Sequence, residues 1–159
     1  ERAIYRLSPA QRQRGLELVR LAALVLFTFP GSPTVYYGDE IGLEGWEDPF
    51  NRGTYSWESG DRELLAYFQR LGALRRSCPP LREGSIQWLY TSGPLLIFAR
   101  ELEKSRLITV LNASDQEREL PLSEPKVRNL LTGAVLSPED GRLRLPPRTG
   151  LLLTEDCPG

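Results

Sequence analysis

The sequence predicts two unequal parts: an α/β segment over residues 1–80 and an all-β antiparallel sandwich over residues 81–159. Before residue 80, apolar residues follow a helix–strand–helix order, which is typical of one step of a parallel sheet. After residue 80 the pattern changes to short strand-like runs separated by turn residues, which is typical of a sandwich. The diproline Pro79-Pro80 stands at this change and marks the expected domain boundary.

The first expected element is a helix that begins after Ser8. Ser8 is a favourable N-cap, Pro9 suits the first helical position, and Gln11 completes a Ser-x-x-Gln capping box. Residues 21–27 are apolar all round, which predicts burial on every side. Pro30-Gly31 is expected to end the helix. Because a membrane span needs about 20 apolar residues, this run predicts a buried helix instead.

A short strand and a second helix follow. Residues 33–37 are rich in β-branched and aromatic side chains, which predicts a strand that Gly38 closes. Residues 42–60 form a long loop rich in glycine, acids and aromatics, and loops of this length are usually functional or disordered. Asp61 is the expected cap of the second helix, whose apolar residues recur at helical spacing as far as the diproline.

Beyond the diproline, three long and four shorter runs predict strands. The long runs cover residues 86–90, 95–99 and 107–111, and the shorter ones lie around 119–120, 127–131, 143–145 and 151–153. Ser92-Gly93-Pro94 and Glu103-Lys104-Ser105 supply the first two turns. Several short strands joined by such turns predict antiparallel pairing.

Composition excludes several classes of function. The 20 basic and 21 acidic residues leave a net charge of −1 with interspersed signs, so we expect no nucleic-acid partner. The absence of histidine excludes a Ser-His-Asp triad and a His-ligated zinc within this chain. Cys78 and Cys157 are too few for an all-cysteine zinc site, and whether they pair stays open. We therefore expect no metal or cofactor in this chain and no membrane segment.

The sequence begins at Glu1 and lacks methionine, so we expect it to be a piece of a longer protein. No signal peptide precedes the first expected helix. Its cellular compartment stays undetermined.

The long loop carries the side chains that suit a sugar ligand. Aromatic rings stack on the apolar faces of a sugar, while carboxylate and guanidinium groups bind its hydroxyls. The candidates are Trp46, Asp48, Arg52, Tyr55 and Trp57. In barrels and open parallel sheets, ligands lie beyond the carboxyl ends of the strands, which is where this loop would stand. Composition alone favours a structural role over sugar binding, because the same residues also hold long loops in place and motif matches of this kind are often false.

Asp39 and Glu40 do not suit a catalytic pair. Retaining glycosidases need carboxyl groups about 5 Å apart on either side of one bond. Adjacent residues at the end of a strand point to opposite sides, so we expect a structural role for at least one of the two.

Several stretches resemble the α-amylase family, glycoside hydrolase family 13. Residues 29–42 are similar to the stretch around that family's eighth barrel strand. Residues 48–57 resemble the following loop in the neopullulanase, cyclomaltodextrinase and amylopullulanase group. Residues 64–80 resemble the last barrel helix. The remainder, including residues 110–114 and 130–133, resembles the C-terminal β-sandwich of the family.

The resemblance implies the last α-β-α step of a TIM barrel followed by a β-sandwich. It also implies a retaining hydrolase or transglycosylase for α-1,4 glucosidic bonds, with α-1,6 bonds as a further option. The family's catalytic aspartate nucleophile, acid/base glutamate and stabilising aspartate lie on earlier strands, and none maps onto this sequence. No catalytic residue is therefore expected here, and the chain alone is expected to be inactive.

The resemblance also suggests roles for the residues around the loop. Asp48 and Arg52 match positions that border the substrate cleft, and Trp46, Tyr55 and Trp57 are weaker stacking candidates. A structural role is expected for Gly31, Pro33, Tyr37, Gly38 and Glu40.

The expected partners are an α-glucan oligosaccharide or polysaccharide and the remainder of the barrel. Apolar faces made for the rest of the barrel predict self-association or a rearranged packing of residues 1–60. The competing hypothesis is a non-catalytic β-sandwich module that binds carbohydrate or protein. The preferred glucan and the calcium requirement of the parent protein stay open.

Overall fold

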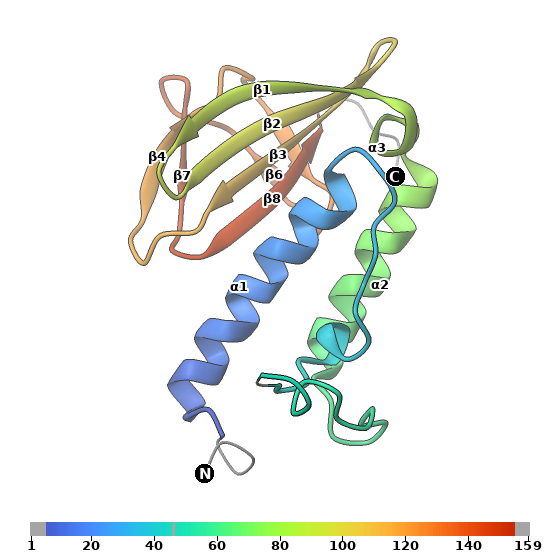
Figure 1. Ribbon diagram of the computed structural model, residues 1–159. Helices are drawn as coiled ribbons and strands as arrows, with labels where there is room; N and C mark the ends of the chain where they lie inside the picture. Colours follow the sequence, from blue (N-terminus) through green and yellow to red (C-terminus); the bar gives the residue numbers. More distant parts are fainter. Residues whose placement is uncertain (1–5, 46, 155–159) are drawn as a thin grey trace.

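A computed structural model describes residues 6–45 and 47–154, and it places a layer of helices against one face of an antiparallel β-sandwich (Figure 1). The helical elements are α1 (Pro9–Thr28), a 3₁₀ turn η2 (Asp39–Ile41), α2 (Arg62–Ser77) and α3 (Pro79–Glu83). The strands are β1 (Ser85–Ser92), β2 (Leu95–Leu102), β3 (Ser105–Asn112), β4 (Arg118–Pro121), β5 (Val127–Asn129), β6 (Val135–Leu136), β7 (Arg142–Leu145) and β8 (Thr149–Thr154). Within the described residues, no helix is long and apolar enough to cross a membrane.

The predicted start of α1 is confirmed, but its predicted burial is wrong. Ser8 and Gln11 form the reciprocal capping box, and the helix ends at Thr28, ahead of Pro30. Leu24 is fully buried, whereas Val25, Leu26 and Phe27 are only partly buried. The apolar run of α1 is therefore buried on one side only, where it meets the sheet and α2, and Ala22 within it stays exposed.

The strand predicted over residues 33–37 is not formed. In Figure 1 the segment descends from the top of α1 towards η2. Val35 is partly buried and packs against the apolar cluster between the helices and the sheet. A strand needs a neighbour for its backbone hydrogen bonds, and the described part of the chain offers none at this place. The segment thus has the composition of a strand, but the strands of residues 6–45 and 47–154 do not pair with it.

The second helix begins at its predicted cap. The side chain of Asp61 accepts a hydrogen bond from the backbone of Leu64, and α2 stops at Ser77, next to Cys78. Pro79-Pro80 does more than stop α2, because proline also fits the first turn of a helix and here begins α3.

Each of the seven predicted runs coincides with a strand, although the run over residues 127–131 is a strand only as far as Asn129, and β6 is an addition. Six strands form one sheet in the order β1-β2-β3-β8-β5-β6, and β4 pairs with β7 in a second sheet. Every pairing is antiparallel. The prediction of helices followed by an antiparallel sandwich is confirmed.

The central strands are buried on both faces, which explains their unbroken apolar runs. On one face, Ile97 and Ile108 pack against Leu120 and other residues of the two-stranded sheet. On the opposite face, Leu107 and Leu152 join the core formed by α1, α2 and α3. The helices therefore share an apolar cluster with one face of the six-stranded sheet, and the two sheets share another.

A buried arginine adds a polar joint between the two layers. Arg100 on β2 is 1% exposed. Its guanidinium donates to three main-chain carbonyls: Thr28 O at 2.8 Å, Leu81 O at 2.9 Å and Gly84 O at 2.7 Å. Burial, and then the nearby charge of Arg75, lower the pKa of Arg100. One side chain thus ties the end of α1 and both ends of the last turn of α3 to the sheet.

An ion-pair network joins the other half of α1 to the sandwich. Arg148, which follows β7, contacts Glu17 on α1 and Asp115 in the loop after β3. The second carboxylate oxygen of Asp115 lies 2.9 Å from Arg14. The hydrogen bond from Arg148, followed by that from Gln13, lowers the pKa of Glu17. The carboxylate form of Glu17 is therefore favoured in the folded chain.

This network predicts acid sensitivity. Because the folded pKa of Glu17 lies below its unfolded value, the resulting stability is present above about pH 4.5 and lost as pH falls through the folded pKa. Urea denaturation between pH 7 and pH 3 should show a smaller loss of stability for Glu17→Gln than for the natural chain. Glu63→Gln, at a 92% exposed side chain, is the control. If the free energy of unfolding of Glu17→Gln falls between pH 7 and pH 3 as much as that of the natural chain, Glu17 is not the source of the acid sensitivity.

Candidate functional site

The loop over residues 42–60 lies at the end of the helical layer farthest from the sheet (Figure 1). Its two ends are held together by backbone contacts, with Asp61 N donating to Ile41 O at 2.9 Å. The hydroxyl of Tyr37 donates to Gly53 O at 3.1 Å and so ties the middle of the loop to the segment before η2. The loop therefore begins and ends at neighbouring points, next to the N-terminus of α2.

The structure brings Asp48 and Arg52 together. Nε of Arg52 lies 2.7 Å from Oδ1 of Asp48, and their side chains are 70% and 63% exposed. An ion pair this exposed contributes little to folding, typically about 0–1 kcal/mol. The pair presents carboxylate oxygens and guanidinium N–H groups to the surface, which is the chemistry that binds hydroxyl groups.

Two of the three predicted aromatic contacts also come together. The rings of Tyr55 and Trp57 lie 4.7 Å apart at an angle of 60°. Trp57 is 79% exposed, and its carbonyl accepts a hydrogen bond from Arg62 at 3.1 Å. Burial, followed by a hydrogen bond with Glu40, raises the pKa of Tyr55. Tyr55 is thus an anchored ring beside an exposed one, whereas Trp46 lies outside the described residues.

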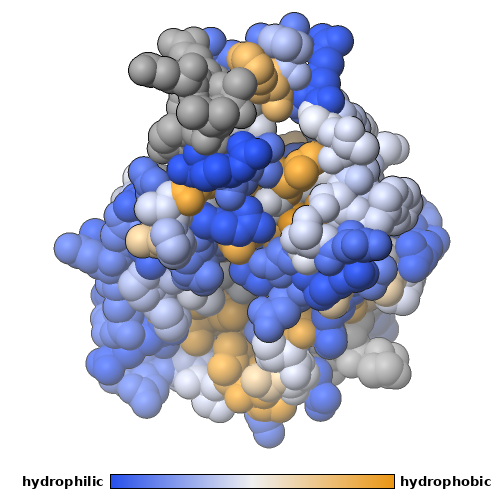
Figure 2. All heavy atoms as spheres, turned by 90° about the horizontal axis from the view of Figure 1, so that it is seen from below, coloured by the Kyte–Doolittle hydropathy of each residue, from blue (hydrophilic) through white to orange (hydrophobic). Residues whose placement is uncertain are grey.

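Further aromatic side chains are exposed near the loop, although none of them was predicted as a sugar contact. Tyr36 and Tyr37 lie with ring centroids 5.0 Å apart, and both are substantially exposed. Phe50, on the loop itself, is exposed as well. Their positions in a predicted strand and beside a proline gave no signal of exposure. Viewed from the loop end, apolar side chains appear between polar ones in a hollowed surface (Figure 2).

Gly38 begins the turn that leads into the loop. Its φ of +97° lies in the left-handed region, and an added Cβ would stand 2.8 Å from a methyl carbon of Leu43. Its amide donates to Glu40 Oε2 at 2.9 Å. Glycine is therefore required here by both backbone conformation and space.

The acidic pair that follows lies in η2, not at the end of a strand. The carboxylate of Glu40 bonds Gly38 and Tyr55, so it acts as a brace within the turn. Burial, and then the charge of Glu40, raise the pKa of Asp39. Glu40 therefore makes structural contacts, as expected for at least one member of the pair. The reason is its hydrogen bonds within the turn, and not a position at the end of a strand.

The remaining two motif residues lie earlier. Gly31 has a φ of +104°, and its carbonyl accepts a hydrogen bond from Arg75. Pro33 lies half-buried in the segment that replaces the predicted strand.

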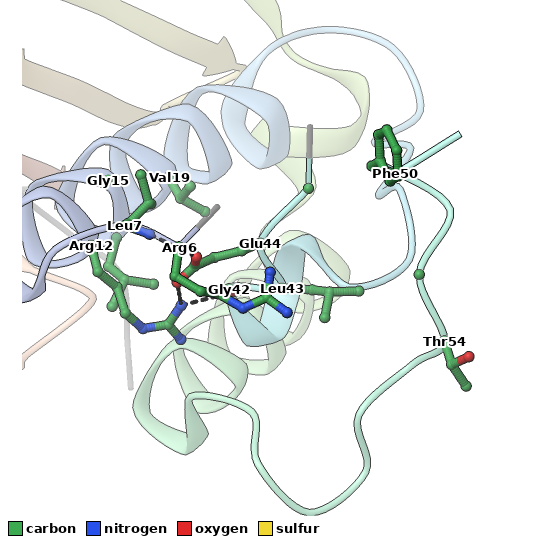
Figure 3. Close-up of a pocket in the computed structure, with 13 residues that line it drawn as sticks. Arg6, Leu7, Arg12, Gly15, Val19, Gly42, Leu43, Glu44, Phe50 and Thr54 are labelled. Atoms are coloured by element: carbon green, nitrogen blue, oxygen red, sulfur yellow. Dashed lines mark hydrogen bonds and ion pairs between the residues drawn. The ribbon is translucent and has the colours of Figure 1, made fainter. Parts of the chain in front are cut away.

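A pocket of about 480 Å³ lies between the first half of α1 and the loop (Figure 3). Arg12 crosses it, donating to Glu44 Oε1 at 2.8 Å and to Gly42 O at 3.1 Å. The amide of Leu7 donates to the other oxygen of Glu44 at 3.2 Å. These bonds, with that from Leu7 as the largest cause, lower the pKa of Glu44. The pair closes the loop against α1.

The described residues hold no group of three or more acidic or cysteine side chains that could bind a metal ion. The site is thus a surface of paired charges and exposed rings on one loop, carried by helices that pack on an antiparallel sandwich.

Known proteins resemble this chain in both sequence and structure. No family model matches the sequence. The chain is 32% identical to a cyclomaltodextrinase of Thermoanaerobacter pseudethanolicus over 138 residues, covering 85% of this chain and 24% of that protein. It is 30% identical to neopullulanase 2 of Thermoactinomyces vulgaris over 145 residues, covering 84% of this chain and 25% of that protein.

Solved structures agree with the sequence relatives. An Anoxybacillus α-amylase superposes with a TM-score of 0.78 at 32% identity, covering 89% of this chain and 33% of that chain. The α-amylase of Geobacillus thermoleovorans, solved with acarbose, gives a TM-score of 0.78 at 26% identity, over 87% of this chain and 33% of that one.

Over this shared part, the chain is homologous to the α-amylase family, glycoside hydrolase family 13, and resembles its neopullulanase-like members. It spans about a quarter of the length of these curated relatives.

Proposed function

We propose that this chain is the C-terminal part of a retaining glycosidase or transglycosylase that acts on α-1,4 glucosidic bonds of α-glucans, with α-1,6 bonds as a further substrate. In this proposal residues 1–80 complete the catalytic barrel, and residues 81–159 form the sandwich that covers it. The segment over residues 33–37 then finds its partner strands in the rest of the barrel. The loop over residues 42–60 forms one wall of the substrate cleft.

The observation that carries the proposal is that one loop exposes both the Asp48–Arg52 ion pair and the ring of Trp57. Because the pair adds little to stability, its polar atoms are available to glucosyl hydroxyls. An exposed tryptophan supplies the apolar face on which a sugar ring stacks. The acarbose bound to the homologous Geobacillus α-amylase supports an oligosaccharide as ligand.

The test is kinetic and uses the enzyme that carries this chain. Arg52→Ala removes a charged hydrogen-bond donor from the proposed cleft, so KM for maltooligosaccharides should rise about tenfold or more. The value of kcat should change little, because a contact made equally in ground and transition states affects binding alone. Steady-state kinetics with a maltooligosaccharide measure both parameters.

Arg144→Ala is the matched control. Arg144 forms a similarly exposed pair with Glu119, 3.1 Å away, but on the sandwich. KM should stay unchanged in this variant. If Arg52→Ala leaves both catalytic efficiency and product pattern at their natural values, the loop does not border the cleft.

A further inference from the structure

The turn that follows α1 is held by two arginines from different elements. Arg75, in the last turn of α2, donates to Phe27 O at 2.7 Å, to Phe29 O at 3.0 Å and to Gly31 O. Arg100 approaches the same turn from the sheet and binds Thr28 O. Four carbonyls at the C-terminal end of α1 thus receive donors from two cations.

This arrangement fits the electrostatics of a helix end. The last carbonyls of a helix lack partners within the helix and carry its negative dipole end, so cations are favoured there. Arg75 is half-buried, and this burial lowers the pKa of its guanidinium. None of the ion pairs found among the described residues involves Arg75 or Arg100. Both side chains serve main-chain oxygens instead of carboxylates.

The turn that Arg75 and Arg100 hold leads directly into the segment over residues 32–38. No described strand pairs with this segment, so its course depends on its two ends and on the packing of Val35. At its far end, Tyr37 binds Gly53 of the loop, and Gly38 begins η2. Fixing the start of the segment therefore helps to fix the point where the loop is attached.

Helix α2 contacts both ends of the stretch between the turn after α1 and the end of the loop. At its start, Asp61 N binds Ile41 O and the Arg62 side chain binds Trp57 O. At its end, Arg75 holds Gly31 and the residues before it. One rigid helix thus sets the distance between the turn after α1 and the loop.

We propose that Arg75 is a positioning residue, which places the loop over residues 42–60 by clamping the turn after α1 to the end of α2. It acts through the segment over residues 32–38 and touches no substrate. The readout that involves substrate rests on the proposed function, whereas the structural readout does not.

The experiment compares Arg75→Gln with Arg75→Lys and with the control Arg76→Gln in the full chain. Arg76 is the exposed neighbour on the same helix. Hydrogen exchange of the amides in residues 36–43 should accelerate about tenfold in Arg75→Gln, the equivalent of one lost hydrogen bond. Arg75→Lys keeps the charge but lacks the guanidinium fork, so it should give an intermediate increase. Arg76→Gln should give none.

The same variants in the enzyme that carries this chain separate positioning from stability. Arg75→Gln should raise KM for maltooligosaccharides several-fold at unchanged kcat, in line with a displaced binding loop. Acceleration confined to residues 27–31, or spread evenly over α2 and the sandwich, would overturn the proposal, because Arg75 would then serve only the turn or global stability. Acceleration over residues 36–43 with an unchanged KM would support the positioning role and contradict the proposed cleft wall.

Discussion

Replacing Arg100 with leucine is expected to lower the free energy of unfolding by about 3 kcal/mol. The substitution leaves the buried carbonyls of Thr28, Leu81 and Gly84 without their donor, and an unsatisfied buried polar group costs about 1–3 kcal/mol. Removing a desolvated charge offsets part of this cost, because burying a charge without a carboxylate partner is itself unfavourable. Since domains are stable by only about 5–15 kcal/mol, the effect is large.

Urea denaturation followed by circular dichroism measures this loss. Arg144→Gln, at an exposed pair on the sandwich, is the control and should change stability by less than about 1 kcal/mol. A loss in Arg100→Leu as small as that of the control would show that Arg100 does not join the two layers.

Replacing Leu152 with alanine is the second substitution with a large expected effect. Leu152 is fully buried on β8 and packs among residues of α1, α2 and α3. Truncating such a side chain costs about 3–5 kcal/mol, because both transfer energy and packing contacts are lost. Since helices and sheet share this core, the helical signal and the sandwich should still unfold in one transition.

Two probes follow this unfolding separately. Circular dichroism at 222 nm reports mainly on the helices, and the fluorescence of Trp88, isolated by Trp46→Phe and Trp57→Phe, reports on β1 of the sandwich. Coincident midpoints are expected for Leu152→Ala. Loss of the helical signal at a lower urea concentration than the Trp88 signal would mean that the layers are separate units.

Much of the fold could be predicted because local signals and burial agree. Ser8 and Asp61 cap their helices in the structure as their side-chain chemistry predicts. The runs around β2, β3 and β8 are long and apolar because both faces of those strands are buried. The segment over residues 33–37 has the composition of a strand, yet pairing depends on a neighbour, which no local pattern reveals.

The candidate site was predictable in its residue types but not in its geometry. Asp48 and Arg52 were singled out as separate cleft candidates, and the structure shows that they form an ion pair, which their spacing of four residues in a turn allows. By contrast, nothing in the sequence distinguishes Arg75 and Arg100 from exposed arginines. Their roles depend on carbonyls of residues 27–31 and of α3, which the fold brings near from distant places.

The central claim is that the loop over residues 42–60 forms a wall of an α-glucan cleft. Hydrogen exchange of the enzyme that carries this chain, with and without a maltooligosaccharide, tests it most directly. The proposal predicts slower exchange over residues 48–57 when sugar is bound, because the ligand covers the exposed Asp48–Arg52 pair and Trp57. Sugar-dependent protection elsewhere in the enzyme with none over residues 48–57 would contradict it.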